Sequence, residues 1–75
     1  MNLTELEKNQ KGRIKQIHAQ LALKKRLLSL GLSLDKEITL LETSLQKNTI
    51  KVALGQSALA LRFDEAKLIE IEVVA

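Results

Sequence analysis

The 75-residue chain contains no cysteine, tryptophan, tyrosine or proline, and it has a single phenylalanine, Phe63, and a single histidine, His18. Without cysteine it cannot form disulfides, cysteine-ligated zinc sites, iron–sulfur clusters or a thiol active site. A secreted domain of this length usually carries disulfides, so we expect a reducing, cytoplasmic compartment.

The sequence contains no apolar run of the roughly 18 residues that a membrane helix needs. Residues 1–10 are polar and acidic, unlike a signal or transit peptide. We therefore expect no direct insertion into a membrane.

Few side chains could carry catalysis or hold a metal. The serines have no histidine near them in the sequence, and the three glycines are isolated, so no phosphate-binding loop is present. One histidine cannot build a histidine-rich transition-metal site, and His18 with Glu70 or Glu72 could form at most a weak surface site. We favour a solvated histidine at a strand end. The sequence predicts no enzyme, no catalytic residue, no bound metal and no cofactor.

The residues that are present predict one small domain spanning residues 1–75. Hydrophobic residues make up 45% of the chain, and nearly all of them are aliphatic, while 28% are charged. This balance is typical of a soluble globular protein and too apolar for a disordered one. A domain of this size buries only about 60% of the surface of its unfolded chain, so it needs a dense core.

Charge is distributed unevenly along the chain, whose net charge is +3. Residues 8–26 contain seven basic residues and no acidic one, whereas residues 35–75 contain seven acidic residues and five basic ones. Most of these side chains are interpreted as solvated faces of a strand and a helix. The basic half could also face an acidic partner, a phosphate group or anionic headgroups.

The hydrophobic pattern predicts a mainly β protein with one short helix inserted after the first strand. Leucines at helical spacing predict a helix over residues 19–30, with Leu27 and Leu30 in the core and Gly31 as its left-handed C-terminal residue. Isoleucines out of phase predict a bulge near Gln16, and Gly55 begins a two-residue hairpin turn of type II′. Alternating residues predict strands over 13–18, 37–43, 49–54, 57–63 and 68–74, with short turns over 2–5 and 64–67. Phe63 and Val73 are expected to point into the core. Closing these short strands into a small barrel would remove exposed edges.

The order of these motifs resembles the ferrous iron transport protein A family (FeoA). The residues that carry the resemblance are the 3–6 Leu-x-x-Leu turn, the 12–17 Gly-x-x-x-x-Ile strand, the 22–32 Ala-Leu-Lys-Lys-Arg-Leu-Leu-Ser-Leu-Gly-Leu segment, Gly55, the 60–62 Ala-Leu-Arg strand, the 64–66 Asp-Glu-Ala turn and the 69–73 Ile-x-Ile-x-Val end. The chain departs from the family where Leu34-Asp35 replaces a Pro-Gly pair and where residues 46–48 replace a Gly-Asp-Pro-like turn. Both changes remove residues that fix turn geometry.

The resemblance implies a five-stranded SH3-like barrel and an accessory role in ferrous iron uptake. The implied partner is FeoB, a membrane permease with a cytoplasmic GTPase domain, which would hold this protein peripherally at the inner membrane. Family members have no established catalysis. The resemblance therefore implies a non-enzymatic regulatory protein that modulates the transport or GTPase activity of the permease.

The predicted helix and its exit carry more leucines than one short helix can bury against one barrel. Exposed apolar side chains often mark an interface, so we predict a partner-binding face made by Lys24, Lys25, Leu28, Leu32 and Leu34. Arg26 beside them would contribute to charge complementarity and association rate. The alternatives are a self-associating structural module, in which the same leucines form a homo-oligomer, and a small nucleic-acid-binding barrel. The last is less favoured, because single-strand binders usually stack bases on aromatic side chains.

Overall fold

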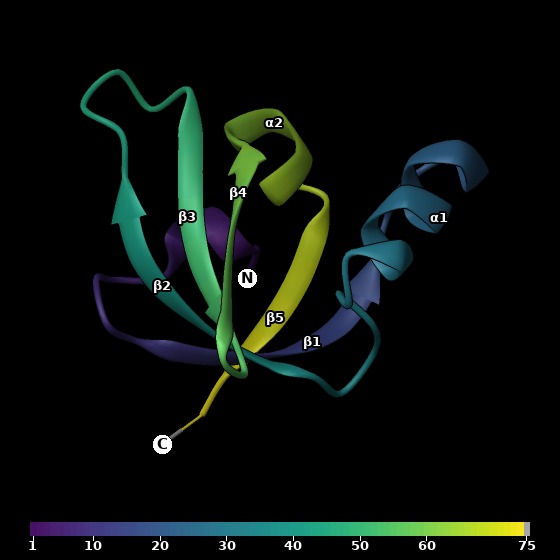
Figure 1. The fold of residues 1–75 in the computed structure, drawn as a ribbon, viewed down its shortest axis with the longest axis horizontal. Coiled ribbons are helices and arrows are strands. Elements are labelled where there is room, and N and C mark those ends of the chain that lie inside the picture. Colours follow the sequence, from purple (N-terminus) through teal and green to yellow (C-terminus); the bar gives the residue numbers. More distant parts are fainter. Residues whose placement is uncertain (75) are drawn as a thin grey trace.

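The strands that the hydrophobic pattern predicts form one short, curved sheet. A computed structural model describes residues 1–74. The chain runs in the order η1 (Leu3–Glu5), β1 (Lys11–Ile17), α1 (Leu21–Ser29), β2 (Glu37–Thr43), β3 (Thr49–Leu54), β4 (Ser57–Arg62), α2 (Phe63–Ala66) and β5 (Ile69–Val73). Figure 1 shows α1 beside the barrel, away from the upright strands β3 and β4. The predicted mainly β fold, with one helix after the first strand, is confirmed.

All five strands pair antiparallel in the order β4-β3-β2-β1-β5. The register between β1 and β5 shifts between Ile14 and Gln16, which is the bulge that the out-of-phase isoleucines predict. The shift lets Ile14 and Ile17 both point into the core. A second shift, between Leu40 and Glu42 in the β2–β3 pairing, bends the sheet further.

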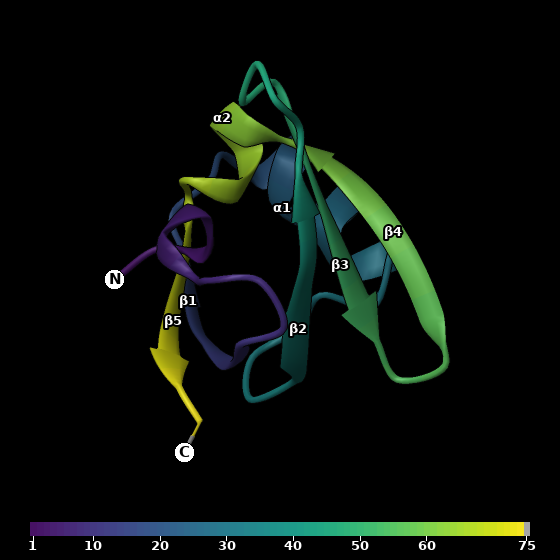
Figure 2. The same cartoon turned by 90° about the vertical axis from the view of Figure 1, so that its left-hand side faces the viewer.

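The two edge strands, β4 and β5, are not paired with each other in the described residues. The expectation that barrel closure removes both edges is therefore wrong. Instead, the chain leaves β4 through α2, whose Ala66 is fully buried, and then enters β5. Figure 2 shows α2 near the top of the molecule and β4 at its margin, on the side opposite β5.

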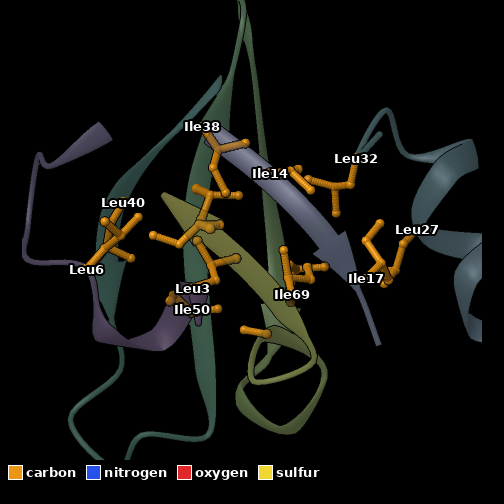
Figure 3. Packing of buried hydrophobic residues seen from close by; sticks show 14 residues of the cluster. Leu3, Leu6, Ile14, Ile17, Leu27, Leu32, Ile38, Leu40, Ile50 and Ile69 are labelled. Atoms are coloured by element: carbon orange, nitrogen blue, oxygen red, sulfur yellow. The ribbon is translucent and has the colours of Figure 1, made fainter. Parts of the chain in front are cut away.

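The core consists of aliphatic side chains from every strand and from the turns. η1 is fixed by a capping box between Asn2 and Glu5, and Leu3 and Leu6 beside it are both buried. Figure 3 shows the core side chains as sticks, with Leu27 and Leu32 pointing toward β1. The full cluster is Leu3, Leu6, Ile14, Ile17, Leu27, Leu32, Ile38, Leu40, Ile50, Val52, Leu61, Ala66, Ile69 and Ile71.

Three side chains predicted to point into the core do not lie fully within it. Leu30 is exposed because it is the C-cap of α1, where the chain leaves the helix. Val73 is exposed at the end of the edge strand β5. Phe63 is half-buried because the chain turns into α2 at this residue, one position before the predicted turn over residues 64–67. The Nζ of Lys67 lies 5.3 Å from the centroid of the Phe63 ring, so a cation covers part of the only aromatic side chain.

The turns use left-handed residues where the chain reverses most sharply. Gly55 has a φ of 61°, while Gln56 is outside the left-handed region, which is the pattern of a type II′ turn. Asp35 (φ 69°) and Lys47 (φ 56°) are left-handed although they are not glycine. Both lie in the loops where the chain departs from the FeoA pattern, so left-handed angles occur there at residues other than glycine. In the described residues, none of the helices is of a length and apolarity that could cross a bilayer.

Candidate functional site

Helix α1 ends in a Schellman motif that buries the residue after Gly31. The N–H of Gly31 donates to the carbonyl of Leu28 at 3.0 Å, and the N–H of Leu32 donates to the carbonyl of Leu27 at 3.0 Å. Gly31 has a φ of 97°, and a Cβ at this position would lie 2.9 Å from Cδ2 of Leu54. The motif brings Leu32 back onto Leu27, and both side chains are 0% exposed. The prediction that Leu32 contacts a partner is therefore wrong, because its side chain is part of the core.

Arg26 lies on the flank of α1 that faces α2 rather than on the predicted partner face. Successive helical residues point about 100° apart, so Arg26 and Leu28 lie on opposite sides of the buried Leu27. The guanidinium of Arg26 forms an ion pair with the carboxylate of Glu65 in α2. Glu65 also accepts a hydrogen bond from the N–H of Arg62. Arg26 thus connects α1 to α2, and its contribution to partner binding is not supported by its position.

The opposite flank of α1 carries two leucines and two lysines at helical spacing. Leu21, Lys24, Lys25 and Leu28 occupy positions i, i+3, i+4 and i+7, so they share one face, here called the α1 face. Leu21 is 66% exposed and Leu28 is 45% exposed, and both lysines are exposed. Leu34, in the loop after the helix, is 56% exposed. Two predicted residues of the partner face, Arg26 and Leu32, therefore separate from the other four, and Leu21 joins them.

The lysines of the α1 face differ in their surroundings from the basic residues of β1. Arg13 donates a hydrogen bond of 3.0 Å to Glu37, whose pKa is lowered by this bond and by nearby Lys11. Lys15 lies 3.9 Å from Asp35. In contrast, α1 contains no acidic residue, and neither Lys24 nor Lys25 has an ion-pair partner within residues 1–74. The two lysines of the α1 face therefore lack the acidic partners that the basic residues of β1 have.

The single histidine has an acidic neighbour on β5. Nε2 of His18 lies 3.2 Å from Oε1 of Glu70, and both side chains are exposed. The structure thus brings together the two groups of the possible weak metal site. Within the described residues, no cluster of three or more potential metal-ligating side chains is formed. The geometry is that of a hydrogen bond between two exposed side chains.

Comparison with known proteins identifies the family. A family model described as "FeoA domain" matches residues 1–73. The chain belongs to the FeoA domain family. A Campylobacter jejuni protein described as "Putative Fe(2+) transport protein A" is 42% identical over 74 residues, covering 99% of this chain and all of its own length.

Solved structures of FeoA-family proteins show the same fold. The FeoA protein of Chlorobium tepidum matches with a TM-score of 0.93 at 27% identity, covering 100% of this chain and 71% of its own. Iron(II) transport protein A of Clostridium thermocellum also has a TM-score of 0.93, at 31% identity, covering 99% of this chain and 46% of its own. The SH3-like small-barrel fold predicted for the chain is confirmed.

The helical pattern of this FeoA-family chain already indicates that Arg26 lies on a different flank of α1 from Leu28. Arg26 directly precedes a core leucine and Leu28 directly follows it, so helical geometry alone places them on opposite flanks. The pairing of Arg26 with Glu65 had no such signal, because the two residues are 39 positions apart. Only the tertiary fold brings α1 and α2 together.

Proposed function

We propose that this FeoA-family chain is a non-enzymatic, cytoplasmic accessory protein of ferrous iron transport that binds a FeoB-like membrane GTPase permease. The observation that supports the proposal is the α1 face, where two exposed leucines flank two lysines without acidic neighbours. Leu34 in the following loop extends the proposed contact. The permease would hold the bound protein at the inner membrane. The bound protein would modulate the transport or GTPase activity of the permease.

The chemistry of the α1 face indicates what the partner surface should offer. Fully burying a leucine side chain is worth about 1.5–3 kcal/mol, so Leu21 and Leu28 can contribute much of the affinity of a modest interface. The lysines of the face should contribute more to association rate and to orientation than to affinity. The complementary surface is therefore an apolar groove bordered by carboxylates. A cytoplasmic segment of the permease with this composition would fit.

The proposal can be tested with two double variants that change net charge equally. Lys24→Glu/Lys25→Glu reverses the charge of the α1 face, and Lys47→Glu/Lys51→Glu reverses two exposed lysines around β3. Binding to the purified permease would be measured by titration in detergent or nanodiscs, with and without guanine nucleotide. The α1 variant should bind at least about tenfold more weakly, mainly through slower association, while the β3 variant should bind like the original chain. Equal affinities for both variants would contradict the placement of the contact.

A further inference from the structure

The two edge strands of the sheet differ in how far the rest of the chain covers them. Along β5, the N–H of Ile71 donates to the carbonyl of Met1 at 2.8 Å, and Asn2 forms a bridge with Glu70. The N-terminal segment therefore covers part of this edge, and the exposed carboxylates of Glu70 and Glu72 flank it. Covering and charging an edge are the usual ways to prevent strands from pairing between molecules. In Figure 2, by contrast, β4 forms the margin of the molecule, with no segment beyond it.

The register of the β3–β4 hairpin shows which backbone groups of β4 are free. A two-residue turn makes the flanking residues Leu54 and Ser57 a hydrogen-bonded pair. Hydrogen-bonded and non-hydrogen-bonded pairs then alternate, so the N–H and C=O of Ala58 and Ala60 point away from β3. The next outward N–H, that of Arg62, already donates to the carboxylate of Glu65 at 3.2 Å. The free edge therefore centres on the two alanines.

The side chains of β4 do not protect this edge. Ala58 and Ala60 are exposed and small, and the strand has no charge before Arg62 at its end. Leu59 points to the inner side of the sheet and remains only partly buried, because β4 is the last strand on this side of the sheet. Short strands, lysines, prolines or bulges usually blunt an exposed edge. β4 is regularly paired over its full length and has none of the last three.

We propose that β4 pairs antiparallel with β4 of a second copy of this chain, about a two-fold axis at Leu59. In this register, Ala58 of each copy lies opposite Ala60 of the other, and each such pair exchanges both backbone hydrogen bonds. Leu59 then lies against Leu59 of the second copy and covers the partly open end of the core. The result is a continuous sheet through both molecules.

A second copy fits this edge because the strand is complementary to itself. The antiparallel register uses only the backbone groups that are free and leaves the bond from Arg62 to Glu65 intact. Arg62 falls opposite the uncharged Gln56 of the second copy, so no like charges face each other. The contact includes no residue of α1, and it does not depend on the proposed permease contact.

Concentration-dependent hydrogen exchange of the full chain tests the pairing residue by residue. Between about 10 µM and about 1 mM, the mass in solution should rise from monomer toward dimer, as mass action requires. The amides of Ala58 and Ala60 should exchange at least about tenfold more slowly at the higher concentration. The amides of Leu59 and Leu61, which already bond to β3, should show a much smaller change. A mass independent of concentration over this range would overturn the proposal, as would a rise in mass without slower exchange at the alanines.

Two variants of the edge locate the contact. Ala60→Pro removes a free N–H without removing a bond to β3 and should abolish the rise in mass. If this variant does not fold, Ala58→Lys/Ala60→Lys places lysines opposite each other across the two-fold axis and should have the same effect. The control Gln46→Lys/Asn48→Lys adds the same charge on the β2–β3 loop and should dimerise normally. If Leu28→Asp abolishes association and the edge variants do not, the copies meet through the α1 face and the β4 proposal is wrong.

Discussion

Replacing Leu32 with alanine separates the core role of this residue from a role in binding. Leu32 is 0% exposed and packs where the Schellman motif folds the chain back onto α1. Its backbone bond to Leu27 survives the change, so the loss arises from the side chain alone. Leucine-to-alanine changes at fully buried sites cost about 2–5 kcal/mol. A chain of this length has a total stability of roughly 4–11 kcal/mol, so the variant should lose a large part of it.

The matched control is Leu34→Ala, two residues further along the chain. Leu34 is 56% exposed, so its truncation should change the free energy of unfolding by no more than about 0.5 kcal/mol. For a domain of this size each kcal/mol shifts the melting temperature by about 4–8 °C. Thermal unfolding followed by circular dichroism should therefore show a fall of roughly 10 °C or more for the Leu32 variant and almost none for the control. Similar melting temperatures for the two variants would refute the assignment of Leu32 to the core.

Three further predictions concern turns and charges. Gly31→Ala should destabilise the chain by about 1–3 kcal/mol in urea unfolding, more than Gly55→Ala, because both positions have positive φ but only the first meets a neighbouring side chain; equal losses would contradict this. The pKa of Glu37 is lowered in the folded state from an ordinary value of 4.5, so its contribution to stability is present above that pH and is lost as the pH falls. Denaturant midpoints of Glu37→Gln should therefore change less between about pH 6 and about pH 3 than those of the original chain. A double-mutant cycle with Arg26→Gln and Glu65→Gln should give a coupling of at most about 1 kcal/mol, since the arginine is largely exposed; a much larger coupling would contradict a surface ion pair.

Much of the fold could be predicted because local signals and the overall topology agree. Alternating aliphatic residues identify the strands, and out-of-phase isoleucines identify the bulge in β1. Gly31 and Gly55 end the helix and form the hairpin turn with the backbone angles predicted for them. In each case one short segment carries both the pattern and its physical cause. Segments of this kind are those for which sequence reasoning is most dependable.

The details that could not be predicted depend on contacts between distant segments. Whether a leucine near a helix end is buried depends on where the helix lies on the barrel. In this position of the helix, Leu32 is buried and Leu21 is exposed. The partner of Arg26 is a residue of α2, and no local pattern connects the two. The free edge at β4 follows from the position of α2 between β4 and β5, which periodicity does not encode.

The proposed docking of the α1 face is tested most directly by hydrogen exchange of the chain alone and bound to the FeoB-like permease from the same cell. We expect slower amide exchange over residues 21–29 in the complex and unchanged exchange in the loop between β2 and β3. The measurement would be made with and without guanine nucleotide. A complex in which α1 exchanges at its free rate, or no complex in any nucleotide state, would show that the α1 face does not dock the permease.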